Sequence, residues 1–168
     1  NGVPLVIPAS TNPKITQQGF NNLFRVPSTD DKQGSSLLDF ITNVLKTKRI
    51  VIIHNKGAYG EGIASEVRQS LKGKGAKEQL FAGINPDDKD FRAILTKIKG
   101  LNPEVVFYGG EHPDAALLIK QAREIGVQAR FVMGDGCFSP ELITLAGKTV
   151  EGCIASNIAP MDAPDPSA

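Results

Sequence analysis

The stretch that decides the predicted fold is RIVIIHNKGAYGEGIASEVRQSLKGKG, residues 49–75. Residues 50–53 are all apolar and β-branched, a composition typical of a strand buried on both faces. Ile63, Val67 and Leu71 then recur at the spacing of one face of a helix, and glycines follow where such a helix would end. The stretch therefore predicts a buried strand, a glycine-containing turn and an amphipathic helix.

The same unit recurs along the chain. Further strands are predicted at residues 79–82, 104–108, 130–133 and 152–155. Three helices are predicted between these strands. The first is indicated by Phe91, Ile94, Leu95 and Ile98, with Asp87 and Asp88 before them and Gly100 after. The second runs from Ala115 to Ile125 after Pro113, and the third has Ser139 as its N-cap and Gly147 as its end. This alternation predicts an α/β, Rossmann-like or flavodoxin-like domain whose parallel five-stranded sheet is flanked by helices. We expect the flavodoxin-like strand order 2-1-3-4-5.

Residues 1–34 do not fit this repeat. Val3–Ile7 is predicted to be a strand, and Phe24–Val26 a short extended segment. An amphipathic helix is then expected after Ser28–Ser35, with its apolar face formed by Leu37, Phe40, Ile41, Val44 and Leu45. The first part is therefore expected to belong to a different domain, with the crossing near residues 21–30.

Composition limits the classes of function. The 168 residues carry a net charge of +1 with both signs interspersed, which gives no basic stripe for nucleic acid. The apolar runs are too short to insert directly into a membrane. The chain begins at Asn1 rather than Met and ends in a loose, proline-containing tail, so we expect a fragment of a longer protein.

The two cysteines, Cys137 and Cys153, lack the companions that a zinc site needs, and no metal site is predicted. They could be two buried free thiols. They could equally form a disulfide that closes a loop of about 16 residues and stabilises the fold by about 3 kcal/mol. The residues alone leave both interpretations open.

Three conspicuous side chains follow the predicted strands. Tyr59, Glu111 and Asp135 each lie in a glycine-rich turn, and the carboxyl ends of parallel strands meet at one edge of a sheet. We therefore expect them on one rim, where the Tyr ring offers apolar surface and the carboxylates favour a cation such as an ammonium group. Each residue taken alone is ordinary turn chemistry or a helix-start acid. The three together favour a binding site.

No catalytic or cofactor motif is found. The glycines at 57–62 lack the dinucleotide-binding order, and neither a phosphate-binding loop nor a nucleophile–base pair is present. His54 and His112 lack partners at metal-ligand spacing and are expected to be solvated or to cap turns. The polar segment 8–13 is either a simple turn or an anion cradle formed by backbone N–H groups and the Thr11 hydroxyl. The chain is therefore not expected to be an enzyme or to bind a cofactor.

The order of these segments resembles a known family. A strand followed by PASTNP, then FRV, a helix, RIVIIH, YGEG, FYGG and GDG is similar to the periplasmic leucine/isoleucine/valine-binding proteins of ABC importers. The resemblance implies two Rossmann-like lobes that are joined by crossovers and close on an amino acid. It divides the chain into the end of lobe one with a crossover (1–25), the α/β domain of lobe two (26–157) and the start of a return linker (158–168).

The resemblance also implies site residues. Ala9 matches a position whose backbone binds the ligand's amino and carboxylate groups, and Thr11 one whose hydroxyl and backbone N–H do the same. Tyr59 matches an aromatic residue that covers the ligand, and Asp135 an acid that pairs with its α-ammonium. Glu111 stands where a branched-chain binder carries tyrosine. This departure leaves open a polar or basic ligand, or a carboxylate that points at solvent.

The implied protein is an extracytoplasmic, periplasmic solute-binding protein that delivers a free amino acid, branched-chain or similar, to membrane permease subunits. An oxidising compartment favours a Cys137–Cys153 disulfide. Without the rest of lobe one, Val3–Ile7 is expected to be disordered or paired with a non-native partner. The alternatives are a receptor of the same fold for amides, urea or aromatic acids, and a flavodoxin-like nucleotide- or phosphate-binding enzyme domain.

Overall fold

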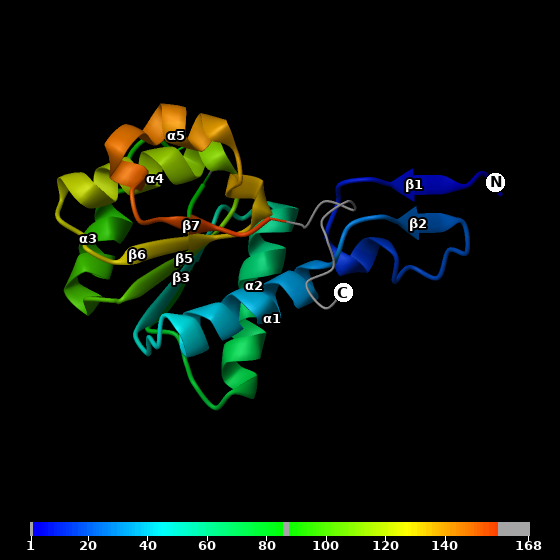
Figure 1. The fold of residues 1–168 in the computed structure, drawn as a ribbon, viewed down its shortest axis with the longest axis horizontal. Coiled ribbons are helices and arrows are strands. Elements are labelled where there is room, and N and C mark those ends of the chain that lie inside the picture. The colour runs from blue at the N-terminus through cyan, green and yellow to red at the C-terminus, as the bar shows by residue number, and fades with distance from the viewer. Residues whose placement is uncertain (1, 86–87, 158–168) are drawn as a thin grey trace, which may run out of the picture.

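The computed structural model describes residues 2–85 and 88–157 (Figure 1). Its strands are β1 (Leu5–Ile7), β2 (Leu23–Arg25), β3 (Ile50–His54), β4 (Leu80–Gly83), β5 (Val105–Gly109), β6 (Arg130–Met133) and β7 (Ile154–Ala155). Its α-helices are α1 (Asp30–Asp39), α2 (Ala58–Gly73), α3 (Arg92–Leu101), α4 (His112–Glu124) and α5 (Pro140–Ala146). Single helical turns lie at Pro13–Ile15, Phe40–Val44, Asp135–Cys137 and Gly147–Val150.

Five strands form one parallel sheet in the order β4-β3-β5-β6-β7. This order is 2-1-3-4-5 and confirms the expected α/β fold. Because side chains alternate along a strand, the sheet has a core on each face. Helices α1 and α2 cover one face, where they pack against residues such as Ile52 and Phe107. Helices α3, α4 and α5 cover the other face, which includes Ile53 and Phe131.

Two helix boundaries differ from the sequence prediction. Helix α1 begins at Asp30, inside the segment that was expected to precede it, and its first turn carries two acids that suit a helix N-terminus. The expected apolar face is also wrong at Val44, which is exposed because the helix ends there in a widened turn. Helix α3 continues past Gly100 to a left-handed Asn102, and Asp87 lies outside the described residues.

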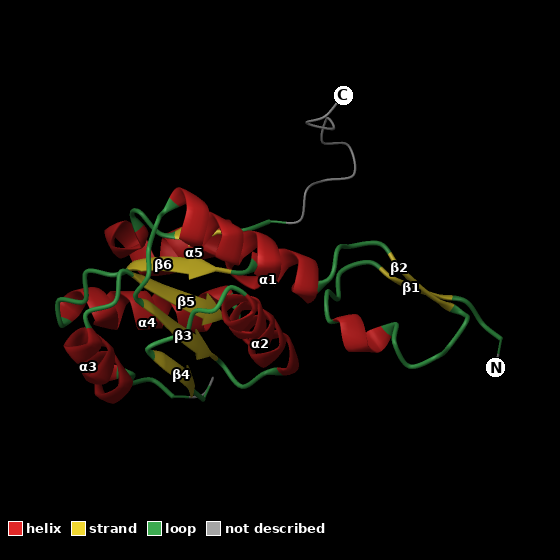
Figure 2. Ribbon diagram, turned by 90° about the horizontal axis from the view of Figure 1, so that it is seen from below, coloured by secondary structure: helices red, strands yellow, loops and turns green. Residues whose placement is uncertain are grey.

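The N-terminal segment stands apart from the α/β sheet (Figure 2). Strands β1 and β2 pair in parallel, with Leu5 opposite Leu23. The expectation that residues 3–7 would be disordered or paired with a non-native partner is therefore wrong, because the extended segment at 23–25 supplies a partner within the chain. Three large side chains of this pair, Leu5, Val6 and Phe24, are 54–58% exposed. The segment proposed as a return linker, 158–168, lies outside the described residues.

Both cysteines are free thiols, so the structure contradicts the expected disulfide. The thiol of Cys137 is directed at the carbonyl oxygen of Gly110, with the sulfur 3.3 Å from it. Cys153 instead lies near the backbone of Phe131 and the side chain of Arg123. The two side chains therefore have different partners.

Candidate functional site

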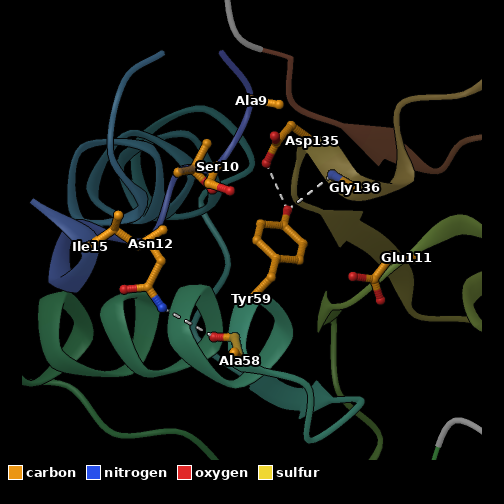
Figure 3. A pocket seen from close by; sticks show the side chains of 10 residues that line it. Ala9, Ser10, Asn12, Ile15, Ala58, Tyr59, Glu111, Asp135 and Gly136 are labelled. Atoms are coloured by element: carbon orange, nitrogen blue, oxygen red, sulfur yellow. Dashed lines mark hydrogen bonds between the residues drawn. The ribbon is translucent and has the colours of Figure 1, made fainter. Parts of the chain in front are cut away.

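A cavity of about 450 Å³ lies between the N-terminal segment and the carboxyl edge of the sheet (Figure 3). One wall comes from the turn after β1, and the other from the loops after β3, β5 and β6. The lining residues are Ala9, Ser10, Thr11, Asn12, Ile15, Ala58, Tyr59, Glu111, Asp135 and Gly136. All five residues that the sequence analysis selected for ligand binding thus surround one cavity, although what they bind stays a prediction.

Tyr59 connects two of the loops. It is the second residue of α2, and its hydroxyl donates a hydrogen bond to Asp135 Oδ1 at 2.7 Å (Figure 3). The same hydroxyl oxygen accepts a hydrogen bond from the Gly136 N–H at 3.0 Å. Burial, followed by the negative charge of Asp135, raises the pKa of Tyr59 above its usual value, so this phenol stays a neutral donor. A side-chain carbon at Gly134 would collide with the Tyr59 hydroxyl, and one at Gly136 with the Tyr59 ring, which explains the glycine-rich turn.

Asn55 was missed by the sequence analysis. It follows β3 directly and is only 4% exposed. Its Oδ1 accepts a hydrogen bond from the Gly57 N–H at 3.0 Å, and its Nδ2 donates to the Glu111 carboxylate. Asn55 therefore ties the loop that carries Tyr59 to the loop that carries Glu111. An amide directly after a buried strand was the available signal, but the Glu111 contact spans 56 positions and leaves no local pattern.

The N-terminal turn is held from outside by Arg25 of β2. The guanidinium donates to the carbonyl oxygens of Ser10 and Asn12, and also to the hydroxyl of Thr16 at 3.1 Å. In a trans peptide the C=O and the following N–H point in opposite directions. Since the Ser10 carbonyl faces Arg25, the Thr11 N–H points away from it. That geometry suits the anion cradle that the sequence suggested.

Asp30 is a second residue that sequence reasoning did not select. Its side chain is fully buried at the start of α1, and its backbone N–H donates to the Thr11 carbonyl at 3.0 Å. Neither carboxylate oxygen has a hydrogen-bond partner in the described part of the chain. Burial raises the pKa of Asp30, the nearby Thr11 side chain offsets part of this shift, and the charges of Asp135 and Glu66 add to it.

The charged residues that line the cavity are all acidic in the described part of the chain. Glu111 and Asp135 are both carboxylates, and no Lys, Arg or His lines the cavity in the described residues. The same negative charges act on the neighbouring Cys137. Burial, and then the charges of Glu111 and Asp135, raise the pKa of its thiol. The cavity therefore favours a ligand with a cationic group. No cluster of His, Cys, Asp or Glu able to hold a metal ion occurs within residues 2–85 and 88–157.

The histidines lie outside this cavity. His54 Nδ1 accepts a hydrogen bond from the Lys56 N–H at 3.1 Å, which confirms the expected turn-capping role. Burial lowers the pKa of His54, so its ring is neutral near pH 7. His112 pairs with Glu141 at 2.7 Å.

No helix in the portion that the structure describes is both long and apolar enough to cross a bilayer.

Comparisons with known proteins agree on one family. The family model described as "Periplasmic binding protein" matches residues 1–168. An "Amino acid binding protein" of Pseudomonas aeruginosa is 44% identical over 146 residues, which is 87% of this chain and 39% of the relative. The "Leu/Ile/Val-binding protein homolog 1" of Brucella suis is 42% identical over 154 residues, 92% of this chain and 42% of the relative. The chain thus spans about two fifths of the length of these relatives.

Solved structures give the same answer for the fold. The leucine binding protein LivK of Thermotoga maritima superimposes with a TM-score of 0.88 at 32% identity, and the match covers 97% of this chain and 47% of that protein. LivJ of Streptococcus pneumoniae, solved in complex with isoleucine, gives 0.78 at 31% identity over 87% of this chain and 41% of that protein.

Proposed function

The chain belongs to the periplasmic binding protein family, and on that premise we propose that it is part of a two-lobed receptor that captures an amino acid for an ABC importer. The relatives named for leucine, isoleucine and valine favour a branched-chain or similar ligand. The observation that carries the proposal is the cavity in which the Tyr59–Asp135 pair stands across from the Ala9–Thr11 turn.

The cavity offers complementary groups to the two ends of an amino acid. Asp135 Oδ1 already accepts the Tyr59 hydroxyl, which leaves Oδ2 to accept from an α-ammonium. The Ala9–Thr11 turn offers backbone N–H groups and the Thr11 hydroxyl to the α-carboxylate. The ring of Tyr59 covers the ligand between them. These groups bind and orient, and the proposed receptor catalyses no reaction.

Transport would follow from hinge closure. Residues 1–25 would belong to lobe one and residues 26–157 to lobe two, so the cavity would lie where the two lobes meet. A ligand that contacts both walls stabilises the closed form, and the permease subunits recognise that form. The receptor would act outside the cytoplasm, in the periplasm or at the cell surface.

The other candidate functions fit the cavity less well. An amide, urea or an aromatic acid has no ammonium group and would leave Asp135 without a cationic partner. A nucleotide or phosphate would meet two carboxylates in the cavity lining.

The test is calorimetric titration of the complete protein that contains this chain. We expect binding of an amino acid from a panel that includes leucine, isoleucine and valine. Asp135→Asn should weaken it by about tenfold to a hundredfold, because a hydrogen bond to a charged group is worth about 1.5–3 kcal/mol. Glu124→Gln is the matched control, since it removes an exposed carboxylate at the far end of α4. Silence across the panel, or full affinity in Asp135→Asn, would contradict the proposal.

A further inference from the structure

Glu111 lines the cavity, and in this chain it is exposed. It precedes α4 at the carboxyl end of β5, and its Oε2 accepts a hydrogen bond from Asn55 Nδ2. Asn55 is itself buried and fixed, because its Oδ1 holds the Gly57 N–H and its backbone N–H donates to the Gly109 carbonyl. The Glu111 carboxylate therefore has a preferred position. Figure 3 shows Ser10 and Asn12 on one side of the Tyr59 ring and Glu111 on the other.

The second oxygen of Glu111 has no protein donor among the hydrogen bonds of the described residues. Two basic side chains from adjoining segments are engaged elsewhere. Arg25 donates to the Ser10 and Asn12 carbonyls, and the Lys56 ammonium donates to Asn85 Oδ1 at 2.7 Å. The described cavity lining supplies no cation of its own to balance Glu111.

The charges of an ordinary amino acid do not correct this imbalance. Its α-ammonium pairs with Asp135 and its α-carboxylate with the N-terminal turn, so the ligand adds no net charge. Glu111 would then keep only the Asn55 amide and the N-terminus of α4 as partners, without a cation, while hinge closure removes its water. A carboxylate pressed against an aliphatic side chain in a dry cleft is unfavourable, because it loses hydration and gains no partner.

We propose that the bound amino acid carries a second positive charge on its side chain, which pairs with Glu111. This inference rests on the proposed function, since it needs the α-ammonium at Asp135 and the α-carboxylate at the Ala9–Thr11 turn. An ammonium or guanidinium group on the side chain forms a charge-assisted hydrogen bond with the free oxygen of Glu111. The cavity of about 450 Å³ falls within the usual range for small-molecule sites, which accommodates such a side chain.

The experiment compares lysine with norleucine in the complete protein that contains this chain. The two ligands share a carbon skeleton and differ only in the side-chain ammonium. We expect wild-type protein to bind lysine at least tenfold more tightly than norleucine. Glu111→Gln should remove most of this preference, and Glu111→Leu should reverse it. Glu124→Gln, which removes an exposed charge far from the cavity, should leave the preference unchanged.

The outcomes separate the inference from the proposed function. If wild-type protein binds norleucine or leucine as tightly as lysine, the inference is wrong while amino-acid capture stands. An unchanged preference in a folded Glu111→Gln variant, or tighter binding of glutamine than of lysine, also overturns it. If no amino acid binds at all, the proposed function fails as well. The wild-type comparison needs no substitution, so a variant that does not fold leaves the test intact.

Discussion

At the scale of single residues, the two tyrosines of the chain make a matched pair. The Tyr59 hydroxyl bonds both Asp135 and the Gly136 N–H. The Tyr108 hydroxyl is buried without a hydrogen-bond partner in the described part of the chain. Tyr59→Phe should therefore lower the free energy of unfolding by about 1–2 kcal/mol and weaken amino-acid binding, because Asp135 loses the donor that orients it.

Denaturant titration and calorimetry of the complete protein measure both effects. Tyr108→Phe is the control, and we expect it to change stability less and to leave affinity intact. Equal losses in the two variants would show that the Tyr59 hydroxyl does not orient Asp135.

At the scale of an element, the first turn of α1 places two neighbouring acids in opposite environments. Burial raises the pKa of Asp30 above its usual 3.8. Between the unfolded-state pKa and the raised folded-state pKa of Asp30, the folded state binds more protons than the unfolded state. Asp30 therefore makes the free energy of unfolding fall as pH rises between these two pKa values. The neighbouring Thr29 side chain lowers the pKa of Asp31. The stability that Asp31 contributes is present above pH 3.8 and is lost as pH falls through its folded pKa.

Asp30→Asn and Asp31→Asn should therefore differ in sign. At neutral pH, Asp30→Asn should raise the free energy of unfolding and Asp31→Asn should lower it. The Asp30→Asn difference from wild type should shrink as pH falls toward about 4, whereas the Asp31→Asn difference should persist to about 4 and shrink only below it, as the folded-state carboxyl protonates. Urea titrations of the complete protein across this range measure the differences. A stabilising effect of Asp30→Asn that is independent of pH would contradict the assignment.

The elements also show what the sequence could predict. The βαβ repeat was predictable because each strand is a local apolar run and each helix a local stripe. The same order placed Tyr59, Glu111 and Asp135 on one rim, since parallel strands share a carboxyl edge. The early start of α1 was missed because residues 28–36 are rich in Ser and Asp, whose weak helix preference hides the N-terminal turn.

Contacts between distant segments could not be predicted in this way. Arg25 reaches the turn at Ser10, and Asn55 reaches Glu111, through geometry that only the folded chain creates. Asp30 became notable for its burial, which its sequence neighbours do not show. The disulfide prediction failed for the same reason, because spacing and compartment say nothing about where the two sulfur atoms point.

At the scale of the whole molecule, the two walls of the cavity rest on sheets of different size. One wall rests on the five-stranded sheet, whereas the N-terminal wall rests on two short strands whose side chains Leu5, Val6 and Phe24 face solvent. Two paired strands alone are marginally stable in water. In the proposed two-lobed receptor, further parts of lobe one would cover these side chains and fix the Ala9–Thr11 turn.

The isolated 168-residue chain should therefore bind amino acids weakly or not at all. It retains Tyr59, Glu111 and Asp135 on a rigid edge, but ordering the turn on the opposite wall takes free energy from binding. Titration of the isolated chain and of the complete protein with one amino acid measures the difference, and circular dichroism of the isolated chain controls for folding. Micromolar or tighter binding by the isolated chain would mean that these 168 residues already form the whole site. Closure against the rest of the proposed lobe one would then add nothing to the affinity for the amino acid.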